Sequence, residues 1–187
     1  MRIILSLALV MVLAPPAFAQ EEDGEGAPLE PQCEVSANWR VVATELGDAP
    51  GMVMDVNKRD AAGLPDCKTK DVKPDFTVGG PDQALWLTNL FGDFLVMARS
   101  TGPIGRVVVQ NLTDRTIAVD AVSDDSQADS WGVTYWEQKE AGTADNCPQL
   151  AEYKEQSFGA VIAHEIRYDF ATKTSLTSGK TNCEPTQ

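Results

Sequence analysis

Histidine is almost absent from the sequence, and this shortage excludes several kinds of catalytic and metal site. His164 is the only histidine among 187 residues, so a histidine-rich metal site cannot form and a Ser-His-Asp triad would have to use this residue. The sequence has no Gly-x-Ser-x-Gly motif to present a nucleophilic serine. His164 alternates with Ile162 and Ile166, which favours a structural role on a buried face. We therefore expect no catalytic residue, no metal and no cofactor, which favours a non-enzymatic interpretation.

Basic residues are also scarce, with 15 Lys and Arg against 28 Asp and Glu, and the formal net charge at pH 7 is −13. Nucleic acids and anionic membrane surfaces are bound through basic patches, so neither is expected as a partner. A basic protein or a small ligand is compatible with this charge, and solubility alone also accounts for it.

Only one apolar run is long, and it lies at the N-terminus. A positive charge at Arg2 precedes the apolar residues 3–13, and the Ala-Phe-Ala sequence at 17–19 is a small-x-small cleavage site. The run is too short to span a bilayer, so the pattern predicts a cleaved signal peptide at 1–19 rather than a membrane anchor. Removal of Arg2 leaves 14 basic and 28 acidic residues, a net charge of −14. We expect a periplasmic or extracellular protein without membrane insertion.

The chain has only four cysteines, and none belongs to a Cys-x-x-Cys pair of the kind used in zinc knuckles and thioredoxin-like sites. An even number in an exported chain predicts two structural disulfides, and four cysteines allow three connectivities. We expect each bridge to tie a loop within its own half of the chain, as Cys33–Cys67 and Cys147–Cys183. In the chain-entropy model, loops of this size stabilise the fold by about 3–4 kcal/mol each.

The sequence divides into an acidic tail and one domain. Residues 20–32 contain five carboxylates with Gly and Pro and almost nothing to bury, so this segment is expected to be disordered. Residues 33–187 are enough for a single β domain with a sizeable core.

Strand patterns dominate this domain, and 148–154 is the one segment with helical character. The polar segments 58–80 and 123–130 are expected to be loops. The expected fold is all-β, a small antiparallel sandwich or partly closed barrel of about eight or nine strands, built from meanders and hairpins with at most one short helix. The predicted strands are 39–45, 52–57, 84–90, 94–99, 106–110, 115–120, 133–137, 160–169 and 173–177.

A weak internal repeat connects two of the predicted hairpins. Residues 106–120 (RVVVQNLTDRTIAVD) superpose without a gap on 164–178 (HEIRYDFATKTSLTS), at an offset of 58 residues. The shared order of strand, Asn or Asp, bulky apolar residue, polar turn and strand resembles a hairpin of a β-propeller blade, although a propeller needs at least about four blades. Two ordinary hairpins with similar turns are the simpler explanation.

Aromatic and acidic residues gather in one part of the chain. In an alternating strand, Tyr135 and Trp136 face opposite sides, so one face can expose an aromatic side chain to a protein or a sugar. A tryptophan that covers the open end of a sandwich is the alternative. The acidic loop 123–130 lacks the glycine and distal glutamate of an EF-hand, which favours a solvated turn over a calcium site. The candidate binding residues are Trp131, Tyr135, Trp136, Asp124, Asp125 and Asp129.

The segment Ser178-Gly179-Lys180-Thr181 resembles the start of the Ser-Gly-x-x-Tyr loop of the periplasmic lysozyme inhibitors, without the tyrosine. The resemblance implies a small disulfide-bearing β protein that blocks a basic enzyme, which suits the negative charge.

The shortage of catalytic motifs favours an exported, non-catalytic binding or interaction protein as the function. Inhibition of a cationic hydrolase is one alternative. A carboxylate-dependent hydrolase is the other, and it would need two acids about 5–10 Å apart in a cleft.

Overall fold

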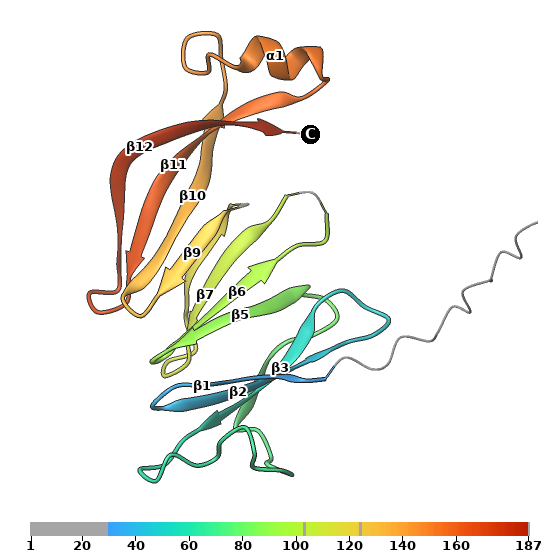
Figure 1. Cartoon of the computed structure of the whole chain (residues 1–187), viewed down its shortest axis with the longest axis vertical. Helices are drawn as coiled ribbons and strands as arrows, with labels where there is room; N and C mark the ends of the chain where they lie inside the picture. Colours follow the sequence, from blue (N-terminus) through green and yellow to red (C-terminus); the bar gives the residue numbers. More distant parts are fainter. Residues whose placement is uncertain (1–29, 103, 124, 187) are drawn as a thin grey trace, which may run out of the picture.

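The structure, a computed structural model that describes residues 30–102, 104–123 and 125–186, consists of three antiparallel β-sheets stacked in chain order (Figure 1). Sheet A contains β1 (Gln32–Val35), β2 (Trp39–Glu45), β3 (Met52–Lys58) and β4 (Phe76–Gly79). Sheet B contains β5 (Leu85–Phe91), β6 (Phe94–Arg99), β7 (Arg106–Asn111) and β8 (Ile117–Val122). Sheet C contains β9 (Ser126–Asp129), β10 (Gly132–Ala141), β11 (Gly159–Asp169) and β12 (Thr174–Thr186). Each sheet is a four-stranded meander.

The predicted all-β fold class is confirmed. The short helix α1 (Leu150–Glu155) overlaps the segment 148–154 that was expected to be helical. Over the described residues the sheets do not close into a barrel. No helix within those ranges has the length and apolarity needed to cross a bilayer.

Sheet B is buried on both faces because its central strands are continuously apolar. In β7, Val108 faces sheet A, while Val107 and Val109 face sheet C, and none of the three is more than 3% exposed. In β6, Leu95 and Val96 point to opposite faces in the same way. Unbroken apolar runs of this kind are typical of strands that are covered on both sides.

The two interfaces of sheet B are built from different side chains. Between sheets A and B the buried residues are mostly aliphatic, with three methionines: Trp39, Val41, Ala43, Met52, Met54, Val56, Val78, Leu85, Leu90, Leu95, Met97, Val108 and Leu112. Between sheets B and C they include four aromatic residues: Phe94, Val96, Val107, Val109, Val119, Ala121, Val133, Tyr135, Ile166, Tyr168 and Phe170.

The three sheets repeat one structural detail. The N–H of the residue after the third strand donates to the carbonyl before the second strand: Arg59 to Asn38 (2.8 Å), Leu112 to Asp93 (2.8 Å) and Phe170 to Trp131 (2.9 Å). In sheets B and C the following turn also repeats, since Arg115 and Lys173 lie 58 residues apart and have φ of 63° and 56°. The sequence repeat therefore marks the third and fourth strands of two successive sheets, which favours a repeated meander over unrelated hairpins.

The expected disulfide pairing is confirmed. Cys33 pairs with Cys67 and Cys147 with Cys183, with Cα–Cα distances of 5.9 and 5.5 Å. The first bridge joins β1 to the β3–β4 connection, and the second joins the segment before α1 to β12. Two disulfides fit a protein of an oxidising compartment, as secreted and periplasmic proteins are.

Three strands were missing from the sequence prediction: β1, β4 and β9. The segments 58–80 and 123–130, which were expected to be loops, contain β4 and β9, and Gln32 of the expected tail begins β1. Each of these strands has four residues, and β1 and β9 are mostly exposed, so hydrogen bonding to a longer neighbour, rather than an apolar pattern, defines them. The expected signal peptide and most of the tail, residues 1–29, lie outside the described residues.

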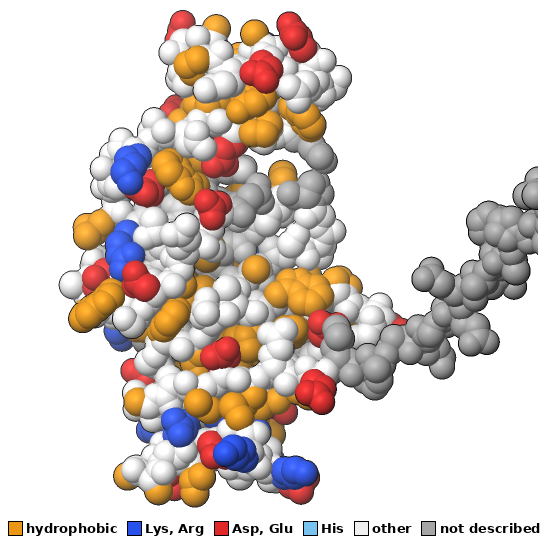
Figure 2. Space-filling model, in the orientation of Figure 1, with side chains coloured by type: hydrophobic (Ala, Val, Ile, Leu, Met, Phe, Trp, Pro, Cys, Tyr) orange, Lys and Arg blue, Asp and Glu red, His pale blue; other side chains and the backbone are white. Residues whose placement is uncertain are grey.

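Charged side chains are spread over the surface rather than gathered in one place. Figure 2 shows acidic side chains from one end of the molecule to the other, with basic side chains among them. Some are paired across strands, such as Glu165 with Lys180 (2.8 Å) and Asp129 with Arg167 (2.9 Å). The negative charge therefore forms no single patch on the face shown.

Candidate functional site

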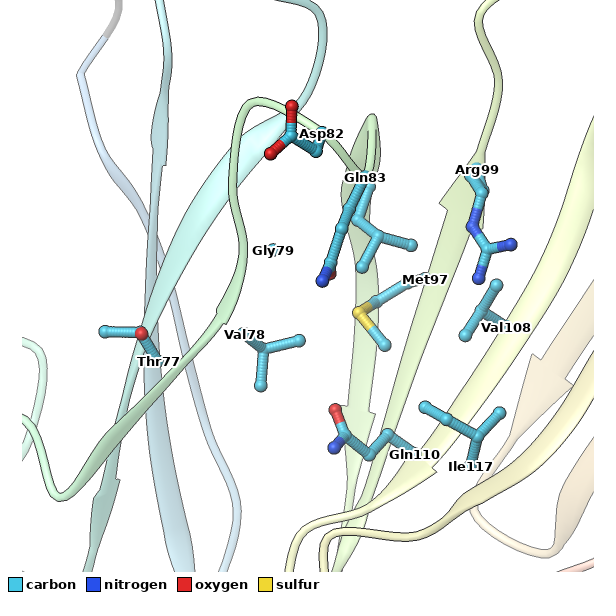
Figure 3. Close-up of a pocket in the computed structure, with 11 residues that line it drawn as sticks. Thr77, Val78, Gly79, Asp82, Gln83, Met97, Arg99, Val108, Gln110 and Ile117 are labelled. Carbon is cyan, nitrogen blue, oxygen red and sulfur yellow. The ribbon is translucent and has the colours of Figure 1, made fainter.

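A hollow of about 470 Å³ lies between sheets A and B, and we call it the A–B cleft. β4 forms one wall, β6, β7 and β8 form the other, and the β4–β5 connection closes one end (Figure 3). A cleft of this volume suits a small ligand. Its polar lining residues are Thr77, Asp82, Gln83, Arg99 and Gln110.

Sheets A and B are joined by hydrogen bonds at the end of the interface away from the cleft. Ser36 Oγ donates to the carbonyl of Gly92 (2.7 Å), and Trp39 Nε1 donates to Asp93 Oδ1 (2.9 Å). These bonds link the β1–β2 turn to the β5–β6 turn. The cleft begins at the opposite end of β5, beside Leu85, where the chain crosses from sheet A to sheet B.

Apolar core residues form the floor of the A–B cleft. Val78, Leu85, Met97 and Val108 line it, and each is at most 8% exposed. Ile117 stands at the rim and is 51% exposed. Because the four floor residues are already almost fully buried, a ligand would remove apolar area from water mainly at Ile117, at about 25 cal/mol per Å².

Backbone geometry at the end of β4 fixes one wall of the cleft. Gly79 has φ of +86°, and a Cβ built there would lie 2.3 Å from the carbonyl oxygen of Met52, so only glycine fits. The N–H of Gln83 donates to the carbonyl of Gly80 (3.1 Å), which turns the chain over the cleft. The Gln83 side chain extends from this turn toward Met97, as Figure 3 shows.

Arg99 brings a positive charge to the cleft. Asp120 is shared by two guanidinium groups, because Arg99 Nη2 lies 2.9 Å from its Oδ2 and Arg106 Nε lies 2.7 Å from its Oδ1. Partial burial opposes ionisation of Asp120, but the hydrogen bond from Arg106 and the charge of Arg99 outweigh it and lower the pKa of this carboxyl. The three groups together carry one net positive charge, and of the two arginines only Arg99 lines the cleft.

Gln110 carries a hydrogen-bond acceptor that the described residues do not use. Its Nε2 donates to the carbonyl of Arg115 (3.0 Å), which fixes the orientation of the amide. Its Oε1 is buried and has no hydrogen-bond partner among the described residues. A buried acceptor without a partner costs about 1–3 kcal/mol, and a ligand donor at this position would recover part of that cost.

A second hollow, of about 370 Å³, lies along the same seam between sheets A and B. Its lining includes Phe76 at the start of β4 and Arg115 in the β7–β8 turn. The guanidinium carbon of Arg115 lies 4.3 Å from the centre of the Phe76 ring, a cation–π contact. The Gln110–Arg115 hydrogen bond therefore joins a residue of one hollow to a residue of the other.

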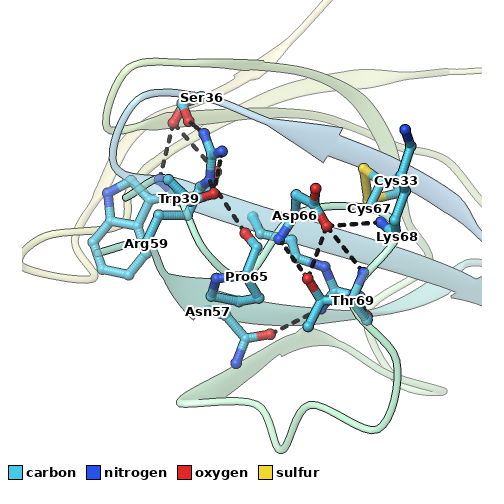
Figure 4. The surroundings of a disulfide bond; sticks show 12 residues. Cys33, Ser36, Trp39, Asn57, Arg59, Pro65, Asp66, Cys67, Lys68 and Thr69 are labelled. Carbon is cyan, nitrogen blue, oxygen red and sulfur yellow. Dashed lines mark hydrogen bonds between the residues drawn. A yellow bond between two sulfur atoms is a disulfide. The ribbon is translucent and has the colours of Figure 1, made fainter. Parts of the chain in front are cut away.

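The outer face of sheet A is covered by the β3–β4 connection, which Cys67 ties to β1 (Figure 4). Arg40 and Asn57 are buried under this connection, and Arg40 Nη1 donates to Asn57 Oδ1 (3.1 Å). Arg40 Nη2 donates to the carbonyl of Thr69 (3.3 Å), and Asn57 Nδ2 to that of Lys73 (2.8 Å). These bonds hold the connection against the sheet, so this face is not an open surface.

The predicted aromatic residues are divided between the two faces of sheet C. Tyr135 is 4% exposed and packs between sheets B and C, where burial raises the pKa of its phenol. Trp136 lies half-buried on the outer face, where a shallow hollow also contains Asp125 and Glu165. Trp131 lies in the β9–β10 turn and is 72% exposed. The structure brings Trp136 and Asp125 together and places Tyr135 in the interior.

The predicted acidic residues have different environments. Asp129 caps the β9–β10 turn, because its Oδ1 accepts the N–H groups of Trp131 (2.8 Å) and Gly132 (3.0 Å). The bond from the Trp131 N–H, followed by that from Arg167, lowers the pKa of Asp129. Its oxygens are therefore occupied by the N–H groups of the turn and by Arg167 of β11. Asp125 is exposed, and Asp124 lies outside the described residues.

His164 and the segment 178–181 also have defined positions. The His164 side chain is 31% exposed, not fully buried as its sequence pattern suggested, and its Nε2 lies 3.7 Å from Glu140 Oε1. Residues 178–181 are exposed in the edge strand β12, beside a register shift in its pairing with β11. The segment is therefore part of a strand, and Lys180 of this segment pairs with Glu165 across it.

No pattern in the sequence indicates the A–B cleft. Its lining comes from five strands and one connection, and no single strand supplies more than three of the residues. Arg99 and Arg106 flank a glycine-containing loop, but their shared carboxylate, Asp120, follows on another strand. Only the pairing of the strands brings these groups together.

Over residues 30–102, 104–123 and 125–186, no group of three or more His, Cys, Asp or Glu side chains is placed to hold a metal ion. Comparisons of the chain with protein-family models, with curated proteins and with solved structures found no match.

Proposed function

We propose that this chain is exported and acts as a non-catalytic binding protein that holds a small ligand in the A–B cleft. One observation carries the proposal: the cleft combines an apolar floor with convergent polar groups and a buried acceptor, Gln110 Oε1, that has no partner in the described structure. Ligand sites in proteins have this size and composition. The N-terminal sequence pattern and the two disulfides support export to the periplasm or the medium.

Binding without catalysis suits the charges in the cleft. Asp82 is the only carboxylate among its described lining residues, and a paired-acid hydrolase needs two. In Figure 3 the carboxylate of Asp82 points away from the other labelled side chains. The hydrolase alternative therefore finds no support in this cleft.

Inhibition of a basic hydrolase is a second proposal, supported by the net charge of −13 and by the exposure of residues 178–181. It predicts binding to a cationic hydrolase such as lysozyme that weakens as salt is added. An activity assay with lysozyme at low ionic strength tests it, and unchanged lysozyme activity with the chain in excess would contradict it.

The experiment for the main proposal is to block the cleft. Gln83 is exposed and its side chain extends into the cleft, so Gln83→Trp fills the space while leaving the core residues in place. Gln127→Trp, at an exposed position in β9, is the matched control. A melting-temperature screen of small polar and amphipathic compounds is then run on the disulfide-bonded parent and both variants.

We expect compounds that raise the melting temperature of the parent and of Gln127→Trp but not that of Gln83→Trp. A screen in which no compound stabilises the parent would contradict the proposal. So would compounds that stabilise all three proteins equally, because they would bind elsewhere.

A further inference from the structure

We infer that the ligand of the A–B cleft is an apolar carboxylate whose carboxyl group lies next to an amide N–H, as in an N-acylated amino acid or the C-terminal residue of a polypeptide. The inference rests on the proposed function and names the chemistry that the cleft recognises. Three features of the cleft carry it: its charge, its buried acceptor and its apolar floor.

The charge at the cleft favours an anion. Asp120 neutralises one of its two arginine partners, so the group formed by Arg99, Arg106 and Asp120 keeps one positive charge. Arg99 lines the cleft, and among the described residues its guanidinium donates to Asp120 through Nη2, so its other N–H groups can donate to a second carboxylate. Asp82 is the carboxylate of the lining that would repel an anion, but it is exposed and points away from the cleft in Figure 3.

The unused acceptor adds a second requirement. Rotation of the Gln110 amide to offer an N–H to a ligand would break the hydrogen bond from Nε2 to the carbonyl of Arg115 (3.0 Å). What Gln110 offers is therefore Oε1, a fully buried acceptor that a ligand N–H or O–H reaches only with a small shift of the amide toward the cleft. A simple fatty acid provides a carboxylate without this donor, whereas an acylated amino acid or a peptide end provides both.

The floor supplies the third requirement. Val78, Leu85, Met97 and Val108 present only aliphatic groups and one thioether between the walls of the cleft. None of the lining residues is aromatic, so the cleft lacks the ring that would stack on a sugar. A branched aliphatic side chain matches this floor better than a polar or planar group.

The experiment uses two probes that differ in one functional group. N-acetyl-L-leucine carries the carboxylate, the amide N–H and an aliphatic side chain, and N-acetyl-L-leucinamide carries a neutral terminal amide in place of the carboxylate. Both are titrated into the full disulfide-bonded chain by calorimetry at low salt. We expect the acid to bind at least about tenfold more tightly than the amide, because a charged partner strengthens the hydrogen bonds to Arg99.

Two variants provide a matched pair. Arg99 and Arg106 both bind Asp120 and are equally exposed at 35%, but only Arg99 lines the cleft. Both variants remove the net positive charge of the group, but only Arg99→Gln also removes the guanidinium that lines the cleft, so Arg99→Gln should abolish the preference for the acid and Arg106→Gln should only reduce it. The melting temperatures of both variants show whether each still folds.

Equal affinity for the acid and the amide would overturn the inference. So would an acid preference that Arg99→Gln retains, or a failure of both probes to bind while another compound from the melting screen does. In these cases the proposed binding function of the A–B cleft still stands. Only a failure to find any compound that binds in the cleft would overturn both the binding function and the inference about its ligand. The tripeptide Ala-Ala-Leu distinguishes the two sources: tighter binding than N-acetyl-L-leucine indicates a polypeptide C-terminus, and weaker binding a free acylated amino acid.

Discussion

The two interfaces of sheet B are similar in position and differ in the side chains that fill them. Between sheets B and C, Phe94 and Phe170 stack with ring centres 4.4 Å apart, and Tyr168 meets Phe94 edge-on at 6.0 Å. Between sheets A and B, the core consists mainly of Val, Leu and Met, and the A–B cleft opens at one end.

The difference between the A–B and B–C interfaces indicates where a fold of stacked sheets can place a ligand site. Large rings reach across the gap between two sheets and contact one another, so aromatic contacts fill the part of the B–C interface around Phe94, Tyr168 and Phe170. Aliphatic side chains are shorter, and at the A–B interface the space that they leave beyond Met97 and Val108 is lined by polar groups from the sheet edges. The A–B interface can therefore stabilise the fold along most of its length and bind a ligand at one end.

The largest expected effect comes from truncating adjacent residues of β6 that face different interfaces. Phe94→Ala should lower the free energy of unfolding by about 3–5 kcal/mol and Leu95→Ala by about 2–4 kcal/mol, since both lose buried contacts and leave cavities. Urea denaturation measures both. If Leu95→Ala costs clearly more than Phe94→Ala, the aromatic contacts do not make the B–C interface the more stabilising of the two.

A smaller effect on stability, which distinguishes the two interfaces more clearly, is expected from replacing adjacent valines of β7 with phenylalanine. Val109→Phe adds volume to the B–C interface and should cost about 1–3 kcal/mol, whereas Val108→Phe can extend into the A–B cleft and should cost less than about 1 kcal/mol. Equal costs in urea denaturation would show that the cleft is not open space beside Val108. Val108→Phe should also weaken any ligand that occupies the cleft.

The smallest expected effect is on the pH dependence of folding stability, through Asp120 on the A–B side of sheet B. Because the pKa of Asp120 is lowered in the folded protein, its ionised form stabilises the fold above the unfolded value of about 3.9, and this stabilisation is lost as the pH falls through the folded pKa. Asp120→Asn should therefore be less stable than the parent at pH 7, with a difference that shrinks as the pH approaches 2.

The measurement is urea denaturation at several pH values between 2 and 7. Asp48→Asn, at an exposed position in the β2–β3 turn, removes the same charge and serves as the control. A difference between Asp120→Asn and the parent that is constant over this range would show that the arginine pair does not act through the ionised carboxyl.

The sequence predicts the strands of this fold better than it predicts the site. The apolar run 107–109 and the alternation in 160–169 indicate strands because each carries its own pattern, and the disulfide pairing agrees with the expectation that each bridge stays within its own half of the chain. β4 and β9 carry no such pattern, since they have four residues each and depend on pairing with β3 and β10. Short edge strands of this kind are defined by tertiary structure rather than by composition.

The candidate site could not be predicted from the sequence, for a related reason. The aromatic and acidic residues near 131–136 are close in sequence, but strand alternation sends Tyr135 to the interior and Trp136 to the surface. Nothing in the sequence around Gln110 or Arg99 marks either residue as part of a site. Their importance depends on which polar groups the strand register leaves without a hydrogen-bond partner. Such information exists only in the three-dimensional structure.

The most direct test of the account is methyl NMR on the three consecutive valines of β7, because they sample both interfaces within one strand. The chain is labelled at valine methyl groups and titrated with the compound that stabilises it most in the melting screen. The account predicts that the Val108 and Val78 signals shift on binding, while those of Val107 and Val109 stay within experimental error. Shifts at Val107 and Val109 as large as those at Val108, or an unchanged Val108 in the presence of saturating ligand, would contradict it.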